Sequence, residues 1–128
     1  MTTRTATCAC GQLSATCTGA PLRISLCHCN ACRLRTGSAF GIAVFYDAGS
    51  VVTSGQSRVF DRLAESGFRV IHHFCPDCGA TVYWLPDRLP GRVAVALGAF
   101  ADQSMPAPDQ QVHLETRLGW VDLPFPSK

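Results

Sequence analysis

Eight cysteines in a chain of 128 residues constrain the fold more than any other feature of this sequence. Seven of them form three tight clusters, at Cys8–Cys10, Cys27–Cys32 and Cys75–Cys78. The first residues contain no apolar signal-peptide stretch, so we expect a cytoplasmic protein whose thiols stay reduced. Under reducing conditions, clustered cysteines are metal ligands more often than they are disulfides. The sequence therefore predicts a zinc protein in which seven cysteines hold two ions.

The first predicted zinc site combines two of these clusters. Cys75 and Cys78 form a C-x2-C-G knuckle, in which two thiolates can bend onto one cation and the glycine accepts a positive φ. A closed structural site needs four ligands. Cys8 and Cys10, in a C-x-C-G motif, are the natural donors of the other two. We expect this structural site to tie the N-terminus to the middle of the chain and to stabilise the fold.

The second predicted site is the C-x-C-x2-C cluster of Cys27, Cys29 and Cys32. Three protein ligands and one open position are typical of a catalytic zinc. A closed site completed by His28 or Cys17 is the main alternative, and a redox role is a weaker one. Cys17 lies on an apolar strand face, where a free cysteine is a small buried hydrophobe.

The pattern of short apolar runs separated by glycine and proline predicts a mainly β domain over residues 1–128, with its core at about 5–123. We expect antiparallel sheets packed face to face, a helical turn at Asn30–Leu34 and a weak helix in Phe100–Met105. The predicted strands are Thr3–Thr7, Gln12–Thr18, Arg23–Leu26, Ala39–Tyr46, Ser57–Leu63, Phe68–Phe74, Thr81–Leu85, Arg92–Ala99 and Val112–Leu118. A net charge of +2 without a basic block argues against nucleic acid, and no apolar run is long enough to span a membrane.

Three histidines outside the clusters are expected to be structural. His72 and His73 are adjacent in a predicted strand, so their side chains point to opposite faces and do not easily bind one metal ion. His113 lies in the last predicted strand.

The order of these motifs resembles the glutathione-dependent formaldehyde-activating enzymes. The resemblance spans roughly Thr5 to Leu123 and ends with His113 and Trp120. The segments that carry it are Cys8-Ala9-Cys10-Gly11, Cys27-His28-Cys29-Asn30-Ala31-Cys32-Arg33-Leu34-Arg35-Thr36-Gly37-Ser38 and Phe74-Cys75-Pro76-Asp77-Cys78-Gly79.

This resemblance implies a fold of stacked antiparallel sheets, called a β-tent, with two zinc ions. It implies a structural zinc on Cys8, Cys10, Cys75 and Cys78, and a catalytic zinc on Cys27, Cys29 and Cys32. The implied activity is that of a carbon–sulfur lyase, which joins glutathione or a similar thiol to formaldehyde or another small aldehyde. The alternative is a non-catalytic, zinc-stabilised binding module of the same fold.

Arg33 and Arg35 directly follow the last cysteine of the second cluster. Zinc with three or four thiolates carries net negative charge, so we expect one of these cations to compensate it or to bind carboxylates of a peptide thiol. Ordinary surface solvation is the alternative for both. The sequence does not predict the oligomeric state.

Overall fold

The computed structural model describes all residues from Met1 to Lys128. It contains ten strands, one α-helix and three short 3-10 turns. The strands are β1 (Thr3–Thr7), β2 (Ser14–Thr18), β3 (Arg23–Cys27), β4 (Gly41–Asp47), β5 (Val51–Ser54), β6 (Arg58–Leu63), β7 (Arg69–Phe74), β8 (Thr81–Pro86), β9 (Arg92–Ala96) and β10 (Gln110–Val112). The helix is α1 (Asn30–Thr36), and the turns are η1 (Ala48–Ser50), η2 (Leu97–Ala99) and η3 (Leu114–Thr116).

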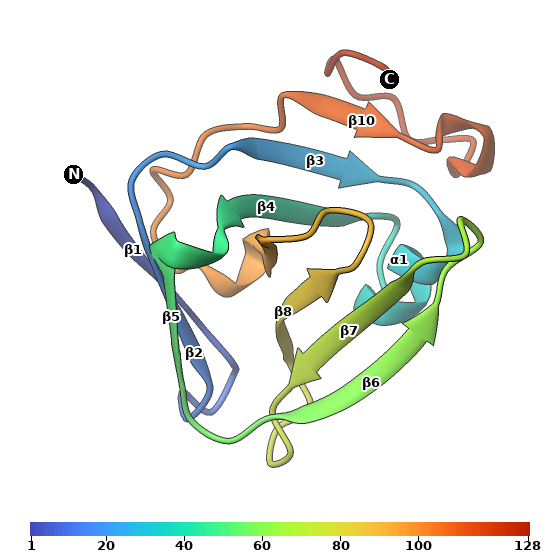
Figure 1. Cartoon of the computed structure of the whole chain (residues 1–128). Helices are drawn as coiled ribbons and strands as arrows, with labels where there is room; N and C mark the ends of the chain where they lie inside the picture. The colour runs from blue at the N-terminus through green and yellow to red at the C-terminus, as the bar shows by residue number, and fades with distance from the viewer.

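The strands form two sheets. The smaller has the order β1-β2-β5, and the larger has the order β10-β3-β4-β9-β8-β7-β6. All pairs are antiparallel except β10 with β3, which is parallel. The larger sheet curves from β10 round to β6, the small sheet closes one side, and α1 lies on the opposite side beside β6 and β7 (Figure 1).

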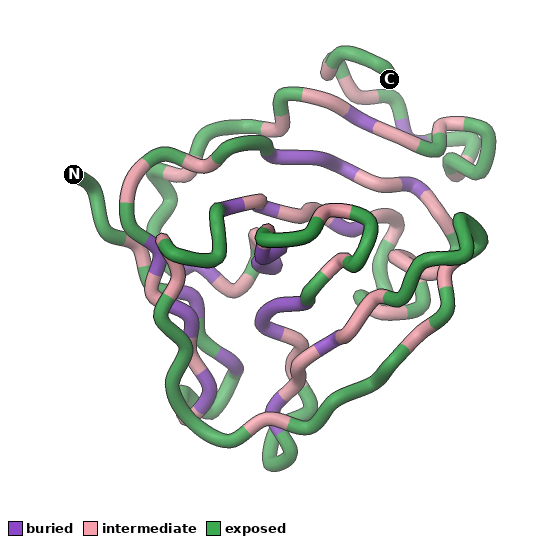
Figure 2. Tube along the Cα trace, viewed as in Figure 1, coloured by how far each residue is buried: buried purple, intermediate pink, exposed green.

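The core lies between the two sheets. It includes Ala15 and Cys17 of β2 together with Val44 of β4, Val82 of β8 and Val95 of β9, all fully buried. Buried segments line the inside of the molecule, whereas β6 is exposed along most of its length (Figure 2). Packing of one sheet on the other confirms the predicted stacked, mainly β architecture.

Most predicted elements are present, with four differences. Residues 51–54 form the unpredicted strand β5, while Phe100–Met105 form no helix. The last predicted strand is wrong beyond Val112, because His113 adopts a left-handed φ of 57° and η3 follows it. The prediction of purely antiparallel sheets is also wrong at β10, a pairing between segments far apart in the chain.

The ends of several elements bring the three cysteine clusters into position. The first cluster follows β1, the second runs from the end of β3 into α1, and the third lies in the turn between β7 and β8. No helix of this fold has the length and apolar character needed to cross a membrane.

Candidate metal centres

The four cysteines of the predicted structural site come together, although 65 residues separate Cys10 from Cys75. Their sulfur atoms all lie within 4.8 Å of one another. The Sγ of Cys10 is 3.6 Å from the Sγ of Cys8 and 3.6 Å from the Sγ of Cys75. A tetrahedron with zinc–sulfur bonds of about 2.3 Å has sulfur–sulfur edges of about 3.8 Å. This cluster therefore fits a tetrahedral ion such as zinc.

Backbone turns hold these sulfurs in place. Gly11 and Gly79, which follow the two motifs, have φ values of 85° and 80°, as the sequence predicts. The N–H of Leu13 donates to the Sγ of Cys8 at 3.3 Å, and the N–H of Asp77 donates to the Sγ of Cys75 at 3.4 Å. Such bonds stabilise thiolates over thiols, which favours metal binding.

Gln12 is a neighbour of this cluster that sequence reasoning missed. Its Nε2 donates to the Sγ of Cys75 at 3.0 Å and to the carbonyl of Gln56 at 2.6 Å. Its Oε1 accepts from the N–H of Gln56 at 2.9 Å. Gln12 thus ties the Cys75–Cys78 turn to the segment between β5 and β6. Its position directly after the C-x-C-G motif was the only signal in the sequence.

The second cluster is built by a strand end and a helix start. Cys27 ends β3, Cys29 is the N-cap of α1, and Cys32 lies in the first turn of that helix. The Sγ of Cys29 accepts from the N–H of Cys32 at 3.4 Å, in the position where serine or aspartate usually caps a helix. The three sulfur atoms lie within 4.8 Å of one another. The predicted three-cysteine set is therefore assembled.

The three thiols cannot all ionise unaided. Contacts with the sulfurs of Cys27 and Cys32 hold the pKa of Cys29 far below its usual range. The sulfurs of Cys29 and Cys32 in turn raise the pKa of Cys27 well above its usual range. A cation among the three sulfurs removes this conflict, since a coordinating thiol is deprotonated. The donor set thus fits a soft divalent ion, and zinc prefers such ligands.

Neither residue proposed to close this cluster is part of it. The side chain of His28 is fully buried, and its Nε2 is 2.8 Å from the Oε1 of Gln111 on β10. Cys17 lies in the core, where burial raises the pKa of its thiol to about 11. No other histidine, cysteine, aspartate or glutamate joins the three sulfurs.

The two arginines after the cluster differ in their contacts. Nη1 of Arg33 donates to the carbonyl of His28 at 2.8 Å and to the carbonyl of Thr116 at 2.7 Å. Arg33 therefore fastens η3 to the cysteine loop. The guanidinium of Arg35 lies over the ring of Trp84, 4.3 Å from its centroid, and is half-buried. Burial lowers the pKa of Arg35, and the three neighbouring cysteine groups act in the opposite direction by stabilising its positive charge. Arg35 is thus the cation that faces the cluster.

A cavity of about 590 Å³ lies between the two cysteine clusters. Ala9 lines it at the four-cysteine site, and Arg35 and Gly41 line it near the three-cysteine site. A Cβ added at Gly41 would lie 3.2 Å from the Cβ of Cys32 and 2.8 Å from Nη2 of Arg35. Glycine here therefore lets the start of β4 pack closely against Cys32 and Arg35.

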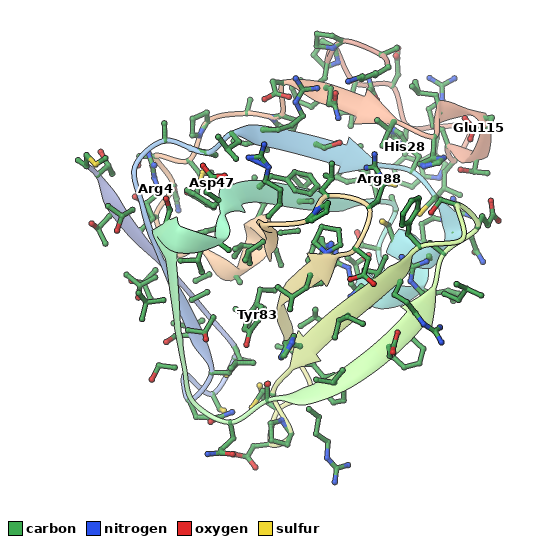
Figure 3. All side chains as sticks on the ribbon, viewed as in Figure 1. Arg4, His28, Asp47, Tyr83, Arg88 and Glu115 are labelled. Carbon is green, nitrogen blue, oxygen red and sulfur yellow. The ribbon has the colours of Figure 1, made fainter.

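The segment after β10 packs on the same end of the molecule. Nδ1 of His113 is 3.2 Å from the Oε1 of Glu115, and the hydroxyl of Thr116 donates to the carbonyl of His28 at 3.0 Å. Figure 3 labels His28 and Glu115 on this side of the molecule. His72 and His73, in contrast, belong to β7 and join neither cluster.

Comparisons with known proteins agree with this arrangement. The profile of the glutathione-dependent formaldehyde-activating enzymes matches residues 3–116. The crystal structure of a Rhodobacter sphaeroides protein, a structural-genomics target, has a similar fold, with a TM-score of 0.59 and 20% identity over 74% of this chain and 85% of the other. Comparison with curated protein sequences finds no match. Because the profile spans most of its length, the chain belongs to the family of glutathione-dependent formaldehyde-activating enzymes.

Proposed function

We propose that this protein is a zinc-dependent carbon–sulfur lyase that condenses a thiol, glutathione or a similar one, with formaldehyde or another small aldehyde. One observation carries the proposal. Cys27, Cys29 and Cys32 gather three sulfur donors, and no further histidine, cysteine, aspartate or glutamate joins them. Arg35 and Gly41, which lie next to this cluster, line a cavity. Such a three-ligand set is typical of a catalytic zinc rather than a structural one.

The two clusters take different roles in this proposal. Cys8, Cys10, Cys75 and Cys78 hold a structural zinc, while the three-cysteine cluster holds the catalytic one. When bound there, zinc supplies a Lewis acid that lowers the pKa of an incoming thiol and polarises a carbonyl. The reaction forms one bond between the thiol sulfur and the aldehyde carbon. The thiol proton ends on the former carbonyl oxygen, so no oxidant or reductant is needed.

Arg35 and Arg33 contribute in different ways. Arg35 faces the three thiolates from α1, and its positive charge offsets the negative charge of the cluster and attracts an anionic thiol. Arg33 holds the carbonyls of His28 and Thr116 and so keeps the cysteine loop in shape. Arg35 is the binding residue and Arg33 the positioning residue.

The proposed setting is the cytoplasm, where glutathione is abundant in its reduced form. None of the eight cysteines forms a disulfide, which is compatible with a reducing compartment.

The direct test is to follow adduct formation from glutathione and ¹³C-formaldehyde by exchange NMR, with the zinc-loaded chain in catalytic amount. We expect the protein to accelerate exchange between the free aldehyde and the adduct above the spontaneous rate. Cys29→Ser should return the rate to that background. Cys17→Ala is the matched control, because Cys17 belongs to neither cluster, and it should retain the acceleration.

If the folded, zinc-loaded chain fails to accelerate this exchange with every small thiol and aldehyde tested, the lyase proposal is contradicted. That result would favour a zinc-stabilised binding module on the same fold.

A further inference from the structure

A second cavity, of about 500 Å³, shares Arg35, Gly79 and Thr81 with the first. It lies between α1 and the exposed end of the large sheet, where β6 and β7 run beside the helix (Figure 1). We call it the α1–β7 cavity. The residues that give it its character are Leu34, Arg35, Phe60, Arg62, His72 and Phe74.

The walls of the α1–β7 cavity are apolar and aromatic. Leu34 and Phe60 are 76% and 59% exposed, which is unusual for large apolar side chains that have no partner. The ring of Phe60 stacks on His72 with centroids 6.4 Å apart, and His72 packs on Trp84 at 5.7 Å. Leu34, Phe60 and Phe74 give the cavity an apolar wall suited to the hydrocarbon part of a ligand, and Trp84 supports His72 outside the lining.

Two cations line the same cavity. Neither Arg35 nor Arg62 takes part in any of the five ion pairs in the structure, and no aspartate or glutamate lines the cavity. Arg35 is shared with the thiol groups of the three-cysteine cluster, and Arg62 is close enough to oppose its positive charge. Arg62 therefore gives the apolar wall a positive charge that no acidic side chain of the cavity neutralises, and this favours an anionic ligand.

His72 adds a buried polar atom that no protein group satisfies. Its side chain is 8% exposed, and its Nδ1 has no hydrogen-bond partner. Buried polar atoms in native proteins nearly always have a hydrogen-bond partner, so this nitrogen is available to a polar group that enters the cavity. Burial lowers the pKa of His72 to about 4, which leaves the imidazole neutral at pH 7.

We propose that the α1–β7 cavity binds a small oxyanion with an apolar body, whose carboxylate or phosphate head lies by Arg35, Arg62 and His72. Its hydrocarbon part packs against Phe60, Leu34 and Phe74. Arg35 lies one helical turn after Cys32 and lines both cavities. The role of this cavity in catalysis rests on the proposed function. In that role, the cavity is a recognition subsite for a thiol substrate that carries an acid group at its far end.

The first test measures binding alone, by calorimetry on the zinc-loaded chain. The probes are hexanoate, hexyl phosphate and the neutral control hexanol. At least one acid should bind ten-fold or more tighter than hexanol, since hydrogen bonds to a charged group contribute about 1.5–3 kcal/mol. The tighter of the two acids identifies the head group.

Variants locate this binding. Arg62→Gln should weaken the binding of the tighter-binding acid about ten-fold. His72→Phe keeps a stacked ring but removes the ring nitrogens, and it should lower the affinity for the acid several-fold. Arg58→Gln removes the same charge from an exposed position on the same strand, outside the cavity, and should leave binding unchanged. Equal affinity for acid and alcohol, or equal weakening by Arg58→Gln and Arg62→Gln, would overturn the site.

The second test compares 6-mercaptohexanoate with 6-mercaptohexanol as thiol substrates for formaldehyde. The acid should have a KM at least ten-fold lower, and Arg62→Gln should remove the difference while kcat changes little. Equal KM values in the unmodified protein would overturn the subsite role. If no thiol is turned over, the lyase proposal fails, and the hexanoate and hexyl phosphate measurements still decide whether the cavity binds an acid.

Discussion

Gly55 shows how one residue secures the surroundings of the four-cysteine site. Its φ is 94°, and an added Cβ would lie 1.9 Å from the backbone oxygen of Gln12, the residue whose side chain bonds to Cys75. Backbone cannot move aside as a flexible side chain can. Only glycine therefore allows the segment before β6 to approach the zinc knuckle so closely.

Gly55→Ala should accordingly destabilise the fold by about 2–4 kcal/mol, from the left-handed strain and the clash together. The measurement is chemical denaturation of the zinc-loaded protein. Gly49→Ala is the matched control, because it has neither a positive φ nor an atom within 4 Å of the new Cβ. Similar loss in both variants would show that Gly55 has no special constraint.

His72 gives a pH dependence at the same scale. Its pKa falls to about 4 in the fold, mainly through burial, whereas an unfolded histidine titrates near 6.5. The unfolded chain therefore binds the proton first, and the stability present above pH 6.5 is lost as pH falls toward 4. His72→Phe should reduce this loss relative to the unmodified protein, as followed by denaturation at several pH values. Identical profiles of stability against pH in the two proteins would contradict the assignment of this pH dependence to His72.

Helix α1 carries two arginines with separable tasks. Arg33 joins η3 to the cysteine loop through two backbone carbonyls, and Arg35 faces the thiols and both cavities. Arg33→Gln should lower stability by about 1–3 kcal/mol, since two carbonyls lose a charged donor. Arg35→Gln should raise the KM for glutathione about ten-fold with a smaller loss of stability.

Paired denaturation and steady-state kinetics on the two variants measure this division. A large KM effect in Arg33→Gln together with none in Arg35→Gln would reverse the assignment.

Local elements were largely predictable because their signals are local. The bounds of β1 agree with the alternating pattern of Thr3–Thr7, and α1 begins at Asn30 as expected. β5 was missed because four residues after a glycine turn look like a loop, and only pairing with β2 makes them a strand. The parallel pairing of β10 with β3 joins segments about 85 residues apart, so no local pattern indicates it.

The candidate site shows the same limit. Cysteine spacing predicted both clusters, because metal ligands must lie close together and the motifs put them there. The roles of Gln12, Trp84 and the α1–β7 cavity depend on side chains that only the folded sheet brings near. Sequence alone also left Arg33 and Arg35 equivalent, and their hydrogen bonds now distinguish them.

For the whole molecule, loss of a ligand from the four-cysteine cluster should affect stability more than loss of a ligand from the three-cysteine cluster. The four-cysteine cluster joins the β1–β2 turn to the β7–β8 turn and so links the two sheets, whereas the three-cysteine cluster lies within a short stretch of chain. Cys78→Ser should unfold the protein or lower its stability by several kcal/mol. Cys29→Ser should leave a folded protein that has lost activity. Circular dichroism and thermal denaturation compare them, and equal unfolding would indicate two structural sites.

In this protein the chain saturates one metal site, and we propose that the other site accepts a ligand from solution. Absorption spectroscopy of the cobalt-substituted protein during a glutathione titration distinguishes the two sites. We expect the sulfur-to-cobalt bands of one ion to stay unchanged while those of the second strengthen as a fourth sulfur binds, and we expect Cys29→Ser to remove the second response. Two four-sulfur spectra that ignore added thiol would contradict this proposal.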